Sequence, residues 1–146
     1  MSRPQTFLSF DFGTRRVGVA QGGSLLRRAQ PLKTVAAEGD ARFAAIAQLI
    51  EEWQPDALVV GVPFHPDGAE HENTQRARRF ARQLHGRYRL PVHEVDERYT
   101  TTEALAQAAN AASGRRGAAD ADAAAAAIIL EQYLRNLPED SDEPAA

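Results

Sequence analysis

The sequence predicts an α/β protein built on a mixed five-stranded sheet with helices on both faces. Short apolar runs of strand length alternate with longer stretches that have helical periodicity. Only turn residues separate the first three runs, which predicts antiparallel neighbours, whereas helical stretches separate the later runs, which predicts parallel crossovers. A chain of 146 residues is long enough for one domain with a sizeable core.

The first two strands are predicted within residues 7–20, FLSFDFGTRRVGVA. The apolar density before Gly13 suits a strand packed on both faces, and the pattern resumes after a short turn, as in a β-hairpin. Asp11 interrupts this strand, although a buried carboxylate is costly unless a cation or hydrogen-bond donors compensate it. It is either a cap for the turn or a functional acid.

Residues 24–35 predict the third strand. Pro31 places that strand at an edge of the sheet, because proline has no N–H to donate to a central ladder. Residues 38–53 carry apolar side chains at helical spacing and predict an amphipathic helix. Residues 57–62, ALVVGV, then predict a short parallel strand that is buried on both faces.

A loop over residues 64–72 is predicted by its proline, aspartate and glycine. A helix follows over residues 73–88, with Asn73 as its N-cap. Residues 91–95 predict the last strand, and a helix over residues 100–112 comes after it.

The last helix is predicted to begin at Asp120 or Asp122, after a Gly-rich basic loop over residues 113–119. The sequence ends in the acidic stretch NLPEDSDEPAA, which cannot build a core. The expected organisation is therefore a single domain over residues 1–137 and a disordered tail over residues 138–146.

Three acids stand out by their predicted positions. Asp11 lies on the first strand, Glu97 at the end of the last strand, and Asp122 at the start of the last helix. Parallel strand ends and the adjoining helix starts meet at one edge of an α/β sheet, so the three carboxylates are expected to converge there. Oxygen ligands favour Mg²⁺ or Mn²⁺, and such ions can promote hydrolysis of a phosphodiester. Each acid also has a simpler explanation, since Asp122 could be an N-cap and Glu97 could pair with Arg98 or Arg15.

Charge leaves a nucleic-acid partner open. The net charge is −3, but four of the 20 acids lie in the tail, which leaves 16 acids against 17 bases in the body. The helix over residues 73–88 carries five arginines outside its apolar stripe, and they form either a solvated face or a nucleic-acid surface: Arg76, Arg78, Arg79, Arg82 and Arg87.

Other classes of site have little support. There is no cysteine, which excludes disulfides and thiolate zinc sites. The four histidines are not at ligand spacing, so loop or surface roles are expected for them. No signal segment or membrane-spanning run is evident, which predicts a cytoplasmic protein.

Five blocks of the sequence, in this order, resemble the YqgF family, also called RuvX, of Holliday junction resolvase-like proteins. They are FDFGTRRVGVA (10–20), WQPDALVVGVPFHPDG (53–68), RARRFARQLHG (76–86), VDERYTTTEA (95–104) and DADAAAAAIILEQYL (120–134). The resemblance implies a ribonuclease H-like fold akin to that of RuvC resolvase. It also implies a role in maturing the 5′ end of the 16S ribosomal RNA precursor.

The family's acidic triad maps onto Asp11, Glu97 and Asp122, with Asp120 left as an alternative to Asp122. The strand over residues 57–62 lacks the acid that RuvC-type resolvases carry there, so Glu97 would have to replace it. Residues 113–119 carry two arginines where relatives often have a longer lysine-rich segment.

The leading hypothesis is a nuclease that depends on Mg²⁺ or Mn²⁺ and acts on structured RNA, with branched DNA as the alternative substrate. Asp11, Glu97 and Asp122 would bind metal and carry the catalysis. The residues expected to contact nucleic acid are Arg15, Arg16, Arg76, Arg79, Arg98, Arg115 and Arg116. Ribosomal particles are a possible partner, and a monomer or a homodimer is expected.

Two other hypotheses use the same residues differently. A non-catalytic RNA-binding module would use the arginine face, although clustered acids contribute nothing to binding phosphates. The Asp-x-Gly-Thr turn also resembles the phosphate loop of the actin, sugar kinase and Hsp70 ATPases. That architecture needs a second such loop, which 146 residues scarcely accommodate.

Overall fold

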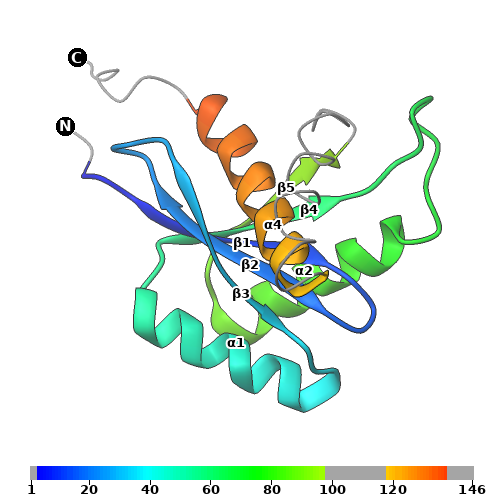
Figure 1. Cartoon of the computed structure of the whole chain (residues 1–146), viewed down its shortest axis with the longest axis horizontal. Helices are drawn as coiled ribbons and strands as arrows, with labels where there is room; N and C mark the ends of the chain where they lie inside the picture. Colours follow the sequence, from blue (N-terminus) through cyan, green and yellow to red (C-terminus); the bar gives the residue numbers. More distant parts are fainter. Residues whose placement is uncertain (1–2, 98–117, 138–146) are drawn as a thin grey trace.

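A computed structural model describes residues 3–97 and 118–137 of the chain, and Figure 1 shows how its elements are arranged. The elements follow one another as β1 (Thr6–Phe12), β2 (Val17–Gly23), β3 (Ala29–Val35), α1 (Gly39–Trp53), β4 (Ala57–Val62), α2 (Thr74–Tyr88), β5 (Val92–Asp96) and α4 (Ala118–Arg135).

The five strands form one mixed sheet in the order β3-β2-β1-β4-β5. β2 is antiparallel to both β1 and β3, while β4 is parallel to β1 and β5 is parallel to β4. This confirms the mixed five-stranded sheet predicted from the sequence. Pro31 lies on the edge strand β3, as expected, and the register between β2 and β3 shifts at Val19/Ala20.

The helices cover both faces of the sheet, with α4 on one face and α1 and α2 on the other (Figure 1). The side chains of β1 alternate between these two layers. Leu8 and Phe10 belong to the cluster that includes α1 and α2, whereas Phe7 packs with the last turns of α4. Both faces of β1 are therefore buried, as its apolar density predicted. Within the described residues, none of the helices combines the length and the apolar character needed to cross a membrane.

Two boundaries differ from prediction. The third strand begins at Ala29 and not at residue 24, because the chain turns there: Arg27 adopts a left-handed φ of 55° and its N–H donates to the Gly23 carbonyl. The Arg27 guanidinium also donates to the carbonyls of Leu134 and Leu137 at the end of α4. The last helix begins at Ala118, so Asp122 lies in its second turn and is not an N-cap. The helix predicted over residues 100–112 lies outside the described residues.

Candidate functional site

Asp11 has no side chain beside it on either neighbouring strand. Its partner on β2 is Gly18 and its partner on β4 is Gly61. Because Phe7 and Asp11 lie on the same face of β1, the Asp11 carboxyl is on the side that α4 covers. The two glycines leave room around that carboxyl, and other groups fill this room.

Gly18 allows the backbone of α4 to approach the sheet closely. A Cβ at this position would lie 1.9 Å from the Asp122 carbonyl oxygen. One turn further along α4, the buried Ser9 hydroxyl donates a hydrogen bond of 2.8 Å to the Ala126 carbonyl. These contacts fix the start of the described part of α4, and with it Asp122, beside Asp11.

Gly61 provides the corresponding space on the other side. A Cβ there would lie 2.7 Å from Oε2 of Glu97, which follows directly after β5, and 2.5 Å from Cδ1 of Ile129. The Glu97 side chain therefore extends over β4 towards Asp11. The parallel pairing of β1, β4 and β5 thus brings Asp11 and Glu97 to the same edge of the sheet, as the sequence predicted.

The electrostatics of these acids show that they lie near one another. Burial and, to a smaller extent, the charges of Glu97 and Asp122 together raise the pKa of Asp11 to about 8. Burial also raises the pKa of Glu97 to about 7, with a contribution from Asp96. Within residues 3–97 and 118–137, no donor or cation offsets the loss of water around the Asp11 and Glu97 carboxyls.

Among the described residues, Asp122 has one cationic neighbour. Nε of Arg16 lies 2.8 Å from Oδ2 of Asp122, and both side chains are partly exposed. Oδ2 itself is buried and accepts no hydrogen bond from the described residues, so the contact is an ion pair without hydrogen-bond geometry. This oxygen has unused capacity to bind a donor or a cation.

The donor set fits a hard divalent cation. All the ligands offered here are carboxylate oxygens, the kind that such ions prefer. They come from the partly buried Asp11, from Glu97 above Gly61 and from the buried Oδ2 of Asp122. A cation between them would offset the repulsion and desolvation that raise the pKa of Asp11. Within residues 3–97 and 118–137, however, no three acids or histidines are close enough together to coordinate a single ion. The side chain of Asp120, the alternative ligand, lies outside the described part.

A cleft of about 600 Å³ opens beside Asp122. The turn between β1 and β2, which carries Arg15 and Arg16, forms one wall, and Asn73 at the start of α2 forms another. Both arginines are exposed, so they can meet a polyanion that enters the cleft. Of the predicted phosphate contacts, the structure thus brings Arg15 and Arg16 to the acids. Arg98, Arg115 and Arg116 lie outside the described residues.

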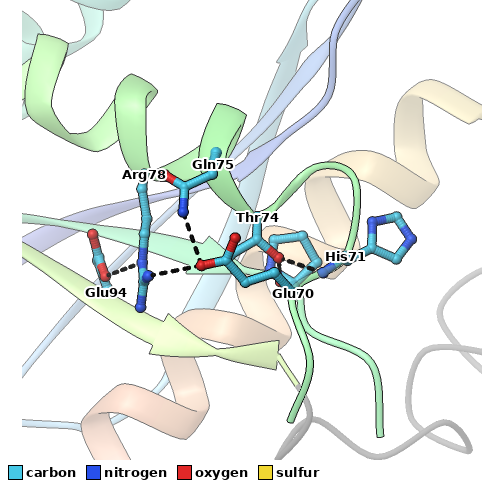
Figure 2. A network of polar contacts seen from close by, with 7 residues as sticks. Glu70, His71, Thr74, Gln75, Arg78 and Glu94 are labelled. Carbon is cyan, nitrogen blue, oxygen red and sulfur yellow. Dashed lines mark hydrogen bonds and ion pairs between the residues drawn. The ribbon is translucent and has the colours of Figure 1, made fainter.

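The arginines of α2 do not form one uniform basic face. Arg78 lies between Glu94 of β5 and Glu70 of the loop before α2, at 3.4 and 3.8 Å, as Figure 2 shows. The Arg87 guanidinium stacks on the Phe43 ring, with 3.9 Å from Cζ to the ring centroid. These two arginines therefore have structural roles. Arg76, Arg79 and Arg82 remain exposed.

The start of α2 is held differently from the prediction. Asn73 occupies the N-cap position but makes no capping hydrogen bond, and its side chain accepts one from Arg76 instead. The Thr74 hydroxyl donates to the Pro63 carbonyl and accepts from the His71 N–H, which ties the loop to the helix (Figure 2). The loop between β4 and α2 projects beyond the edge of the sheet (Figure 1).

Two of the histidines lie together, although the sequence spacing gave no indication of it. The rings of His65 and His71 are 5.1 Å apart, because Phe64 and Glu70 form a β-bridge that folds the loop back on itself. Sequence reasoning also missed Arg42, which is almost fully buried at the start of α1. Its position within an amphipathic helix gave no signal that it faces the sheet.

The chain is similar to known proteins over most of its length. The RuvX family model, described as Holliday junction resolvase, matches residues 5–136. A protein of Albidiferax ferrireducens, provisionally named a pre-16S rRNA nuclease, is 69% identical over 133 residues, which cover 91% of this chain and 80% of the relative. A protein of Polaromonas sp. with the same name is 65% identical over 134 residues, covering 92% and 91%.

Among solved structures, T. thermophilus RuvC in complex with a Holliday junction substrate matches 90% of this chain and 95% of its own, with a TM-score of 0.56 and 16% identity. This likeness concerns the fold alone, and it confirms the predicted ribonuclease H-like, RuvC-like architecture. On the match of the family model and the identity of the relatives, the chain belongs to the RuvX family.

Proposed function

We propose that this protein is a metal-dependent nuclease that hydrolyses phosphodiester bonds in the 16S ribosomal RNA precursor, at the 5′ end of the mature RNA. The observation that carries the proposal is the placement of Asp11 between Glu97 and Asp122, next to an arginine-lined cleft. Carboxylates without a bound cation would repel the phosphates of RNA. Their position beside exposed arginines therefore favours a site at which a cation binds the carboxylates and the arginines bind the RNA.

In this proposal Asp11, Glu97 and Asp122 would supply carboxylate ligands to Mg²⁺ or Mn²⁺, and they would have to move closer together to share one ion. Asp11 lies between the other two acids, because its strand neighbours are Gly18 beside Asp122 and Gly61 beside Glu97. The bound metal would supply Lewis-acid activation of the phosphodiester and of the attacking water. Arg16 holds Asp122 through their ion pair, and Arg15 at the cleft contacts the phosphates that flank the cleaved bond.

The RNA substrate is inferred from the relatives, two of which share 65% and 69% identity with this chain and are named for pre-16S rRNA. Such a substrate would place the protein in the cytoplasm, with ribosomal particles as partners. Branched DNA is the second candidate, because the family model is described as a Holliday junction resolvase. Symmetric cutting of a junction would require a homodimer, whereas trimming of an RNA end needs only a monomer.

The test uses purified protein with a labelled 16S rRNA precursor fragment and with a four-way DNA junction, each in Mn²⁺, Mg²⁺ or EDTA. Cutting of the RNA is expected with a divalent ion and not in EDTA. Asp11→Asn should lower the rate at least about 100-fold, since metal catalysis contributes several kcal/mol. The matched control is Asp67→Asn on the projecting loop, where asparagine keeps the Oδ1 acceptor that holds the Ala69 N–H.

Full activity of Asp11→Asn would overturn the proposal. Preferential cutting of the junction would show that branched DNA is the substrate, and we would then expect the protein to be a dimer. Salt-sensitive RNA binding without cutting of either substrate, free or within a ribosomal particle, would instead identify a binding module of the same fold.

A further inference from the structure

A second cavity, of about 250 Å³, lies on the other face of β1 from the carboxylates. Phe12, the residue after Asp11, lines this cavity, so the two sites lie on opposite sides of the end of one strand. The start of α1 and the first half of α2 form the walls. The polar side chains among its lining residues are Arg42, Arg76, Arg79 and Gln83.

Arg42 is a buried cation without a carboxylate partner. Only 6% of the residue is exposed. Its Nε donates to the Ala37 carbonyl at 2.8 Å, and one terminal nitrogen donates to the Thr14 carbonyl at 3.1 Å. Its guanidinium lies over the Phe12 ring, 5.6 Å from the centroid. The described residues place no acid within ion-pair distance of it, although buried charges are usually paired.

The surroundings of Arg42 add positive potential to this cavity. Arg79 is exposed and makes no ion pair or hydrogen bond with the described residues, while Arg76 uses one terminal nitrogen on Asn73. The N-terminus of α1 is also accessible from this cavity, since Gly39 lines it. Glu38 at the N-cap position makes no side-chain capping hydrogen bond, and a Cβ on Gly39 would meet no atom within 4 Å. The partial positive charge of the helix end therefore adds to that of the arginines.

Two acids lie near this cavity, but neither neutralises Arg42. Glu38 is close enough to raise the pKa of Arg42 while burial lowers it, yet the two form no ion pair. Asp40 is fully exposed and lies 4.0 Å from Arg87. The electrostatic potential of the cavity is therefore positive, because three guanidinium groups and the N-terminus of a helix contribute more than two solvated carboxylates.

We propose that the cavity lined by Arg42, Arg76 and Arg79 binds a phosphate group of the RNA strand, at a position separate from the bond that is cut. A strand that runs from the carboxylates across the turn between β1 and β2 would reach this cavity on the opposite face of β1. Arg42, which donates to Thr14 of that turn, would link the position of the turn to the bound phosphate. The choice of RNA rests on the proposed function, whereas the binding itself needs neither metal nor cutting.

The test measures binding of a single-stranded RNA oligonucleotide in EDTA, where no cutting interferes, over a series of salt concentrations. Arg79→Gln should weaken binding about fivefold and reduce the slope of log affinity against log salt by about 0.7, the value for one phosphate contact on a single strand. The matched control is Arg82→Gln, since Arg82 is also an exposed arginine of α2 but does not line the cavity. The control should keep the wild-type slope.

A second readout locates the anion without RNA. Titration with inorganic phosphate should shift the NMR signals of the Gly39 N–H and the Arg42 Nε–H, and Arg79→Gln should abolish these shifts. Equal losses for Arg79→Gln and Arg82→Gln would show a diffuse basic surface and overturn the proposal. If phosphate shifts these NMR signals but Arg79→Gln has no effect on RNA binding, the cavity is a site for a small anion. This result would overturn the assignment to RNA. If no metal-dependent cutting is found but these binding results hold, only the proposed function is overturned.

Discussion

The two faces of the sheet near Asp11 are built from side chains of very different size. On the α1–α2 face, the ring of Phe80 lies 5.1 to 6.0 Å from three other phenylalanine rings, those of Phe10, Phe12 and Phe43. On the α4 face, glycines occupy positions 18 and 61, and the helix contributes Ala123 and Ala126. The aromatic face contributes mainly burial of apolar area, whereas the small-residue face lets the α4 backbone approach the sheet beside Asp11.

The same contrast exists along α4 itself. Its last turns pack against large side chains, with Leu130 and Leu134 fully buried near Phe7. Its first described turns pack through Gly18 and Ser9 instead. The large residues hold the helix on the sheet, and the small residues set how close Asp122 comes to Asp11. Substitutions of the small residues are therefore expected to change the site geometry, whereas substitutions of the large residues are expected to lower stability alone.

Gly18→Ala should have the largest effect. Its Cβ would lie 1.9 Å from a backbone oxygen of α4, which cannot move away as a flexible side chain can. We expect the free energy of unfolding to fall by more than about 3 kcal/mol, beyond the usual cost of overpacking. Chemical denaturation measures this. Gly86→Ala in α2, where a Cβ meets nothing within 4 Å, is the control and should stabilise by about 0.5 to 1 kcal/mol. A stable Gly18→Ala variant would show that α4 does not need this close approach.

Gly61→Ala should affect activity more than stability. Its Cβ would displace the ends of the Glu97 and Ile129 side chains, which can rotate, so we expect a loss of about 1 kcal/mol. Metal-dependent cutting should fall at least about tenfold, because Glu97 is moved away from Asp11. The control is Val60→Ala, the adjacent residue on the aromatic face, which should lose about 2 kcal/mol but keep its activity per folded molecule. Parallel losses in the two variants would contradict a division of roles between the faces.

The stability of the metal-free protein should depend on pH through the carboxyls of the α4 face. The pKa of Asp11 is raised to about 8 and that of Glu97 to about 7, so the folded state keeps protons that the unfolded state has released above about pH 4. In EDTA, the free energy of unfolding should therefore fall as pH rises from about 4 to 8. Asp11→Asn should reduce this fall and stabilise the metal-free protein by about 1 kcal/mol at pH 8. Stability that rises with pH in this window would contradict the raised pKa values.

Much of the fold could be predicted because each strand is a short apolar run with a clear boundary. The helix over residues 73–88 and the strand over residues 57–62 were predicted to within one residue. Ser24–Leu26 read as strand because leucines suit a strand, but Leu25 and Leu26 are exposed in a turn. Local propensity cannot show that a run of apolar residues has no partner to pack against.

Less of the site could be predicted. The edge at which Asp11 and Glu97 meet follows from strand order, so the sequence indicated it. The roles of Gly18 and Gly61 depend on the register between strands, which the sequence pattern did not fix. Which arginine of α2 pairs with Glu94 likewise depends on which residues of β5 lie beside α2. Arg78 makes this pair, whereas Arg79 makes no ion pair within the described part of the chain. The predicted roles of Asp11, Glu97 and Asp122 in metal binding stay predictions.

The exposed turn at Leu25 and Leu26 offers a place for a spectroscopic label. It follows Gly23, which pairs with Thr6 at the start of β1, so it lies at the opposite end of the sheet from the carboxylates. Leu26 is 78% exposed, and the chain has no cysteine that would compete for a thiol-reactive dye. A single cysteine introduced at Leu26 would carry one fluorophore, and energy transfer to a dye on either end of an RNA would report the direction in which the strand lies across the protein.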